Sequence, residues 1–286
     1  MTRTVGIVLK SGSREAVEAL AVVRPHLGDA RLLIEREGPH AFTELPTWIE
    51  PVDRLHFEAD SELVLALGGD GTIIHAASLL QNRVVPIIGV NLGRIGFLAE
   101  VTLDDAATAL PQALAGELPH SDRLRLDARI VRDGRVALRV RILNDAVVAQ
   151  LALARVAVYR ITRERDLVTL VRGDGVIIAT PTGSTAYSMA AGGSILEPGL
   201  DAIGLTPICP HGLSQRPLVL PTDRSLSVQL ESDNAVFATL DGQVGHDFKR
   251  GDTLVVERSP IPTRLLNVPG RSHFETLRRK LRWGDT

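Results

Sequence analysis

The stretch that decides how this chain folds is LVLALGGDGTIIHAA, at residues 63–77. Five apolar residues come first, a glycine-rich turn follows at residues 68–71, and a second apolar segment begins directly after it. A short, continuous apolar run is typical of a strand buried on both faces. A buried strand that turns at once into a helix is the repeating unit of parallel α/β sheets. The stretch therefore predicts a parallel sheet with helices on its faces.

The surrounding hundred residues continue this alternation of strand and helix. Short apolar runs at 4–9, 31–34 and 84–90 predict further strands, and helical spacing of apolar residues predicts a final helix at 104–114. Consecutive βαβ units build a mostly parallel sheet. We therefore expect a Rossmann-like α/β domain over residues 1–118.

Beyond residue 122 the pattern changes to an alternation of apolar and polar residues. Runs such as LRLDARIV and VALRVRIL place an apolar residue at every second position, and Asp-Gly turns separate them. A period of two is typical of antiparallel strands with one buried face. We therefore expect an all-β sandwich domain over residues 119–270, followed by an amphipathic helix near 272–281.

The composition is that of an ordinary globular protein. Hydrophobic residues make up 44% of the chain, which is enough for a packed core, and the net charge of −2 gives no general attraction to nucleic acid or anionic membranes. No apolar run approaches the roughly 20 residues that span a bilayer. The single cysteine, Cys209, cannot form an internal disulfide, and we expect it to be buried. These features predict a cytoplasmic protein without nucleic-acid or membrane partners.

The glycine-rich turn GGDGT at residues 68–72 is the first candidate site. It lies where a strand ends and a helix begins, and ligands of α/β sheets bind at this edge. Glycines there let the backbone approach a phosphate and direct N–H groups toward it. A carboxylate such as Asp70 repels phosphate unless it holds a metal through water or accepts a proton from an attacking hydroxyl. Capping the helix is the alternative role for Asp70.

The turn is neither of two common nucleotide-binding loops. It lacks the Gly-Lys-Thr or Gly-Lys-Ser ending of the P-loop, and it does not have the GxGxxG spacing of dinucleotide-binding folds. It resembles instead the signature of a kinase superfamily that includes NAD kinases, diacylglycerol-type lipid kinases and, more distantly, phosphofructokinases. The turn therefore indicates phosphoryl transfer and leaves the acceptor open.

Three further stretches bear on the acceptor. NLGRIGFLAE, at 91–100, follows the next strand and combines two glycines with an arginine and Phe97. Asn144 and Asp145 place an amide beside a carboxylate, which suits a base edge and a sugar diol or, alternatively, a simple turn. GDGVIIATPTGSTAYSMAAGG, at 173–193, has a density of hydroxyls and glycines that packing does not readily explain.

Together the motifs resemble the bacterial NAD kinase family along nearly the whole chain. The family's order and spacing are kept by GGDGT, NLGRIGFL, LNDAVV, GDGVIIATPTGSTAYS, PHGLSQRPLVL and LDGQ. The resemblance implies an enzyme that uses ATP and Mg²⁺ to phosphorylate the 2′-hydroxyl of the adenosine ribose of NAD, making NADP. It also implies a homodimer or homotetramer, and a C-terminal helix within 271–286 that packs back on the first domain.

The resemblance further implies roles for individual residues. Asp70 corresponds to the proton acceptor, with Gly71 beside it at the ribose, and Asp145 stands where glutamate is the commoner residue. The phosphate loop would consist of Gly68, Gly69, Gly71 and Thr72. The remaining expected NAD-binding residues are Phe97, Asn144, Asp145, Arg155, Arg172, Asp174, Thr185, Ala186, Tyr187, Ser188, Met189, Ala190 and Gln243. No side chain is expected to bind metal directly, since ATP would carry the Mg²⁺.

Two other classes of protein fit part of the sequence. A lipid kinase would need an apolar entry groove and interfacial basic residues, and the sequence has neither. A non-catalytic NAD-binding regulator would need a degenerate phosphate loop, whereas GGDGT is intact. The sequence leaves open whether polyphosphate can replace ATP, whether NADH is accepted along with NAD, and whether NADP inhibits.

Overall fold

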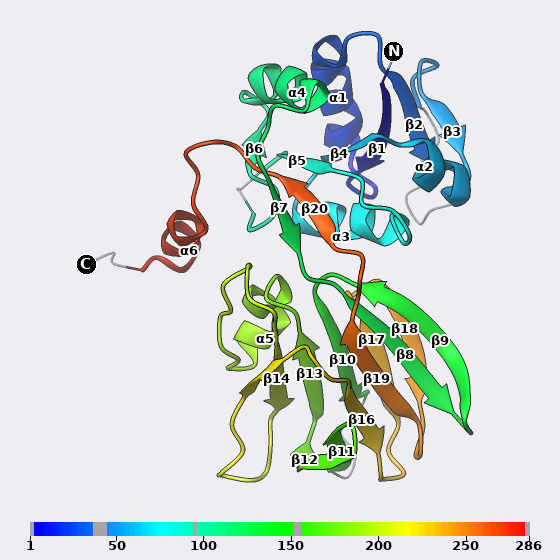
Figure 1. Cartoon of the computed structure of the whole chain (residues 1–286), viewed down its shortest axis with the longest axis vertical. Helices are drawn as coiled ribbons and strands as arrows, with labels where there is room; N and C mark the ends of the chain where they lie inside the picture. Colours follow the sequence, from blue (N-terminus) through cyan, green and yellow to red (C-terminus); the bar gives the residue numbers. More distant parts are fainter. Residues whose placement is uncertain (1–2, 37–44, 94–95, 152–155, 284–286) are drawn as a thin grey trace. The chain divides into compact units, whose positions relative to one another are not determined.

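The computed structural model describes residues 3–36, 45–93, 96–151 and 156–283 (Figure 1). Its contacts divide the chain into two compact units, Met1–Asp122 with Thr263–Thr286, and Arg123–Pro262. Domain limits at residues 118 and 270 stay a prediction. The strands next to those limits, β7 and β20, both belong to the sheet of the first unit.

The first unit is built on an eight-stranded sheet with the order β3-β2-β1-β4-β5-β20-β7, and β6 pairs with β5. The neighbours β3-β2-β1-β4-β5-β20 are all parallel, as is the pair β5-β6. The predicted run at 84–90 becomes a strand only from Ile87, because Pro86 has no N–H to donate to a neighbour. The strands are β1 (Thr4–Leu9), β2 (Arg31–Glu35), β3 (Glu50–Val52), β4 (Leu63–Leu67), β5 (Ile87–Asn91), β6 (Val101–Thr102), β7 (His120–Arg123) and β20 (Thr263–Leu266).

Helices cover both faces of this sheet. On one face, Leu20 of α1 and Leu110 of α4 share a buried cluster with the β1 side chain Ile7. On the other face, the ring of Phe57 in α2 and the side chain of Ile73 in α3 pack against strand glycines. The elements are α1 (Arg14–Val23), the 3₁₀ helix η1 (Arg24–Leu27), α2 (Arg54–Asp60), α3 (Asp70–Leu79), α4 (Ala106–Ala115) and α6 (His273–Leu281).

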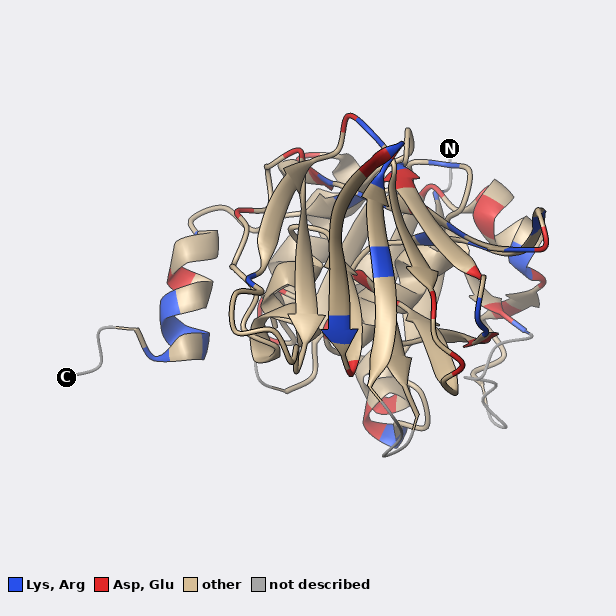
Figure 2. Cartoon of the chain, turned by 90° about the horizontal axis from the view of Figure 1, so that it is seen from below, with Lys and Arg blue, Asp and Glu red and all other residues tan. Residues whose placement is uncertain are grey.

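Helix α6 follows β20 and is amphipathic. It buries Leu277 and carries three basic residues in its last turn, visible as the blue band of this helix in Figure 2. Cations at a helix C-terminus complement its dipole. Just before the helix, Arg271 Nη2 contacts Asp105 Oδ2 at 2.6 Å, which ties the segment to the start of α4.

The second unit consists of two six-stranded sheets, with orders β15-β14-β13-β10-β17-β18 and β12-β11-β16-β19-β8-β9. All their pairings are antiparallel. The strands are β8 (Leu126–Arg132), β9 (Arg135–Ile142), β10 (Asp145–Gln150), β11 (Ala157–Arg163), β12 (Asp166–Gly173), β13 (Gly175–Ala179), β14 (Ala202–Ile208), β15 (Leu218–Pro221), β16 (Leu226–Leu230), β17 (Val236–Leu240), β18 (Val244–Phe248) and β19 (Thr253–Arg258), with η2 (Gly183–Thr185) and α5 (Tyr187–Ala190) between β13 and β14.

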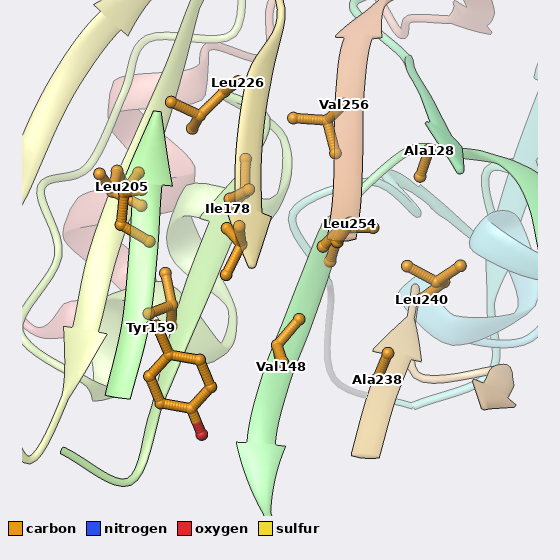
Figure 3. Packing of buried hydrophobic residues seen from close by; sticks show 14 of the residues in the cluster. Ala128, Val148, Tyr159, Ile178, Leu205, Leu226, Ala238, Leu240, Leu254 and Val256 are labelled. Atoms are coloured by element: carbon orange, nitrogen blue, oxygen red, sulfur yellow. The ribbon is translucent and has the colours of Figure 1, made fainter. Parts of the chain in front are cut away.

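The alternating pattern explains how the two sheets pack. Ile178 of the first sheet and Leu254 of the second belong to one buried cluster (Figure 3). Tyr159 is fully buried there, and its hydroxyl donates to the backbone oxygen of Asp174 at 3.1 Å. Burying each large side chain contributes about 1.5–3 kcal/mol. The parallel α/β sheet and the β-sandwich together confirm the predicted fold class.

Two further observations concern the cysteine and the helices. Cys209 is exposed, so the expectation that it is buried is wrong. It has a φ of 43° and follows directly after β14, so it lies outside the run of buried residues that this strand provides. In the part of the chain that is described, no helix combines the length and apolarity that a membrane crossing would require.

Candidate active site

The Asp70 carboxylate is fixed by the chain that follows β5. Its Oδ2 accepts the backbone N–H of Phe97 at 2.8 Å, and its Oδ1 accepts those of Leu98 at 2.9 Å and Ala99 at 3.2 Å. Gly69 is the N-cap of α3, and Asp70 is the first helical residue, so the helix-capping role for Asp70 is wrong. A carboxylate offers about four acceptor positions, and three are used. One position, on Oδ2, therefore remains for a substrate hydroxyl.

Parallel pairing brings the two motifs together. Because β4 and β5 are adjacent and parallel, the turn at 68–72 and the stretch at 91–100 leave the same edge of the sheet. The approach is so close that a Cβ on Gly96 would lie 1.9 Å from Asp70 Oδ1. Only glycine fits there. Arg94, the other notable residue of the stretch, lies outside the described residues.

The turn itself presents main-chain donors. The N–H of Gly68 is used by the Val90 oxygen at 2.9 Å, and the N–H of Thr72 returns to Gly69 at 3.0 Å. Within the described chain, the N–H groups of Gly69, Asp70 and Gly71 bind no backbone carbonyl. Unused N–H groups at a helix N-terminus, together with its dipole, suit a phosphate.

One residue of the C-terminal helix approaches Phe97. The Lys280 ammonium lies 5.8 Å from the centroid of the Phe97 ring, within the range of a cation–π contact. A cavity of about 70 Å³ lies next to this contact and is lined by Glu100, Arg271, Glu275, Thr276, Arg279 and Lys280. The charge around Phe97 thus comes from a segment nearly two hundred residues later in the chain.

In the second unit, the start of β10 wraps around Asp241. Asp241 Oδ2 accepts the N–H of Leu143 at 2.7 Å, and Oδ1 accepts those of Asn144 at 2.7 Å and Asp145 at 3.1 Å. Asp241 has a φ of 54°, a conformation that aspartate tolerates better than most residues. Sequence reasoning selected Gln243 of the LDGQ turn and missed Asp241. The available signal was the Asp-Gly pair at residues 241–242, because an aspartate directly before a glycine is typical of a turn.

Burial changes the acidity of Asp145. Its side chain is only 7% exposed, and this burial, together with the neighbouring Asp241 carboxylate, raises the pKa of Asp145 to about 7. Only Asp241 has backbone N–H donors to hold a negative charge. Burial raises the pKa of Asp241 as well, but three backbone N–H groups and Arg125 oppose that rise. We therefore place the pair's negative charge mainly on Asp241 and its proton mainly on Asp145.

Two buried polar atoms next to this pair have no hydrogen-bond partner among the described residues, Asn144 Oδ1 and Thr182 Oγ1. The loop after β13 is tied to β10 here, since the N–H of Thr180 donates to the Asn144 oxygen at 2.9 Å. An unsatisfied buried polar atom costs about 1–3 kcal/mol. Such atoms mark a position where a polar ligand group would be stabilising.

Several hydroxyls of the 180–190 loop serve its own packing. Thr180 Oγ1 donates to the Leu143 oxygen at 2.5 Å, Ser184 Oγ donates to Pro181 at 2.6 Å, and Ser188 pairs with Thr206 at 2.9 Å. The interpretation that packing does not explain this hydroxyl density is wrong for these three. The predicted site residues Ala186, Tyr187, Ala190 and Gln243 are exposed, Thr185 and Met189 are half-buried, and Ser188 is buried.

Asp174 lies at the opposite end of this sheet, whereas Arg172 lies on β12 of the other sheet. β10 and β13 are antiparallel, with Asp145 opposite Ala179, and Asp174 Oδ1 accepts from Gln150 Nε2 at 2.8 Å. Five residues of strand separate Asp145 from Gln150, which is about 17 Å. One copy of the chain therefore does not bring Asp174 to Asn144 and Asp145. Arg155 lies outside the described residues.

The described residues also bear on metal binding. No group of three or more His, Cys, Asp or Glu side chains within them is placed to hold a metal ion. The acidic residue nearest the phosphate turn, Asp70, already accepts three backbone N–H groups. The turn is arranged to present donors to an anion.

Comparison with known proteins gives consistent matches over both units. Residues 5–118 match the ATP-NAD kinase N-terminal domain, and residues 143–268 match the ATP-NAD kinase C-terminal domain. The NAD kinase of Citrifermentans bemidjiense is 44% identical over 241 residues, covering 84% of each chain. The NAD kinase of Koribacter versatilis is 38% identical over 285 residues, covering 99% of each chain.

Solved structures agree in fold. Yeast NADH kinase complexed with NADH superposes with a TM-score of 0.90 at 24% identity, covering 100% of this chain and 89% of that one. An identity this low shows the fold alone. An NAD kinase from Archaeoglobus fulgidus in complex with ATP gives a TM-score of 0.72 at 25% identity, covering 98% of each chain.

Proposed function

This chain belongs to the NAD kinase family, and on that premise we propose that it transfers a phosphoryl group from ATP to the 2′-hydroxyl of the adenosine ribose of NAD. The observation that carries the proposal is the junction at Asp70. There a carboxylate with one remaining acceptor position stands at the start of a helix whose first N–H groups are unused. An acceptor hydroxyl and a phosphate need these two features side by side.

The chemistry at this junction is a proton transfer coupled to phosphoryl transfer. Asp70 Oδ2 accepts a hydrogen bond from the ribose 2′-hydroxyl and takes its proton as the oxygen bonds to phosphorus and the ADP oxygen leaves. The N–H groups of Gly69, Asp70 and Gly71 hold phosphate oxygens on the other side. Three backbone hydrogen bonds keep the Asp70 carboxylate oriented, so no reorganisation is needed when the hydroxyl arrives.

Mg²⁺ enters this proposal as part of the donor. Mg²⁺ retains waters readily and is commonly bound through substrate phosphates rather than by an all-protein cage. The donors at the phosphate turn are N–H groups, which fit phosphate oxygens. Mg·ATP is therefore the donor species that suits this turn.

The second unit supplies the groups that fit an adenosine moiety. Asn144 Oδ1 and Thr182 Oγ1 lack partners and could accept and donate hydrogen bonds at a base edge. Asp145, whose pKa burial raises to about 7, has two carboxyl oxygens that suit the hydroxyls of a sugar diol. The exposed aromatic ring of Tyr187 is available for stacking. Phe97, Thr185, Ala186, Met189, Ala190 and Gln243 complete the proposed NAD-binding set.

We also propose a homodimer or homotetramer in which the site is shared between copies. Asp174 lies about 17 Å from the Asn144 end of β10, and Arg172 lies on the other sheet, so we assign both residues to the NAD site of a second copy of the chain. Mixing Asp70→Asn and Asp174→Ala proteins after partial denaturation and refolding should then restore activity, because mixed oligomers contain one intact site. No recovery in oligomers shown to be mixed would contradict the shared site.

We further propose a cytoplasmic location. We also propose a first domain of residues 1–118 and 271–286 and a second domain of residues 119–270.

A direct assay identifies which phosphoryl donors and which acceptors the protein uses. NADP formation is measured with Mg·ATP or polyphosphate as donor and with NAD or NADH as acceptor, and added NADP tests inhibition. Formation of NADP from NAD and ATP is the expected result. A folded protein that binds NAD without phosphorylating it would instead favour the alternative of a non-catalytic NAD-binding regulator.

Asp70→Asn tests the role of the carboxylate. We expect turnover to fall by about 10²- to 10⁴-fold, the contribution of a general base, while the dissociation constant for NAD changes little. Asp53→Asn is the matched control, because Asp53 also accepts a backbone N–H, as the cap of α2, and asparagine caps equally well. If NAD affinity fell together with turnover, Asp70 would act only by positioning residues 97–99.

A further inference from the structure

A lysine stands beside the phosphate turn. β1 and β4 are adjacent parallel strands with Leu9 opposite Leu67, and the N–H of Lys10 donates to the Leu67 oxygen at 2.9 Å (Figure 1). Lys10 is therefore the neighbour of Gly68 at the carboxyl edge of the sheet. A Cβ on Gly68 would lie 3.0 Å from the Lys10 Cβ, so the base of the lysine side chain packs against the turn.

The Lys10 ammonium has no counter-charge of its own. The residue is exposed, and within the described part of the chain its ammonium forms no ion pair or side-chain hydrogen bond. The acidic residue that ends the neighbouring strand β2, Glu35, lies 3.8 Å from His75 Nε2 instead. Lysine is also rare in this sequence, with only Lys249 and Lys280 elsewhere.

We propose that the Lys10 ammonium binds the triphosphate of the donor nucleotide, beside the N–H groups of Gly69, Asp70 and Gly71. This inference rests on the proposed function of the turn. The donor carries several negative charges, and Asp70 adds another, while the N–H groups supply only partial positive charge. A full positive charge on a flexible stem can follow the phosphates as charge moves toward the leaving oxygen.

A structural role for Lys10 has different consequences. If the residue matters only because its stem packs on the turn, Lys10→Met, which keeps an unbranched stem without the charge, should behave as the wild type. If the charge binds phosphate, Lys10→Met should lose donor affinity and Lys10→Arg should retain part of it. Lys249→Met is the matched control, since Lys249 is an exposed lysine of the second unit.

The experiment measures kcat/KM for Mg·ATP, KM for NAD, and equilibrium binding of ATP and AMP by calorimetry. For Lys10→Met we expect kcat/KM for ATP to fall by about 10- to 100-fold, the contribution of one charged hydrogen bond. KM for NAD and the affinity for AMP should stay within about twofold, because the contact is with the outer phosphates. Lys10→Arg should recover part of the loss, and Lys249→Met should match the wild type.

Two outcomes would overturn the proposal, and two others bear on the proposed function and on the phosphate contact. Lys10→Met with unchanged kcat/KM for ATP would remove the phosphate contact. Equal losses of ATP and AMP affinity would indicate a disturbed nucleoside site or a disturbed fold, which thermal unfolding of the same samples would reveal. A wild-type protein that makes no NADP would contradict the proposed function alone, because the comparison of ATP and AMP binding still tests Lys10. Weaker inhibition of Lys10→Met by tripolyphosphate would support the phosphate contact without the nucleoside.

Discussion

Replacing Asp241 by asparagine should destabilise the second unit and change the acidity of its neighbour. The Asp241 carboxylate accepts three N–H groups, from Leu143, Asn144 and Asp145. Asparagine has nearly the same shape and also tolerates the positive φ of 54° found here, so the change isolates the hydrogen bonds. If the amide oxygen keeps the two bonds of Oδ1, the amide nitrogen must face the N–H of Leu143.

The magnitude follows from that mismatch. One hydrogen bond to a charged group, worth about 1.5–3 kcal/mol, is lost, and a buried donor is left facing another donor. We expect the free energy of unfolding to fall by about 2–4 kcal/mol, which is a large part of the 5–15 kcal/mol typical of a domain. Removing the Asp241 charge also removes one of the two causes that raise the pKa of Asp145. That pKa should therefore move down from about 7.

The assay is urea unfolding observed separately for each unit. Trp48 and Trp283 lie in the first unit, whereas Tyr159 and Tyr187 lie in the second, so tryptophan and tyrosine signals distinguish the two transitions. Asp241→Asn should shift only the tyrosine transition. Asp233→Asn is the control, because the Asp233 side chain is 79% exposed and a surface ion pair contributes little. A shift no larger than that of the control would refute the assigned role of Asp241.

Two other predictions concern the pH dependence of stability and the position of the Asp70 carboxylate. Between about pH 4 and pH 7 folded Asp145 holds a proton that the unfolded chain has released, so its contribution lowers stability as pH rises through that window. Asp145→Asn should reduce this slope in urea unfolding at pH 5 and pH 7, while Asp241, whose pKa burial also raises, retains part of it; an unchanged slope would contradict the raised pKa of Asp145. Gly96→Ala should lower turnover by about 100-fold, because the new methyl group displaces the Asp70 carboxylate. Gly93→Ala adds a methyl group that meets nothing within 4 Å, and equal turnover in both variants would contradict the prediction.

The fold class and the chemistry of the turn could be predicted from local patterns. A continuous apolar run before GGDGT distinguishes a strand buried on both faces, and the period of two beyond residue 122 distinguishes strands with one buried face. These patterns depend only on which face of each element is apolar. Glycines at a strand-to-helix turn likewise predict, from a few adjacent residues, that a phosphate can approach the backbone.

Which atoms meet depends on long-range strand pairing. The bonds from Asp70 to residues 97–99, and from Asp241 to residues 143–145, join segments that are distant in sequence. They depend on which strands are neighbours and in which register, and no local pattern specifies either. Strand direction likewise separates Asp174 from Asp145, and register puts Lys10 beside Gly68. The kind of fold and the kind of reaction can be predicted from residue order alone, because periodicity and motif chemistry are local. The assignment of each polar atom to packing or to a ligand was decided by long-range strand pairing.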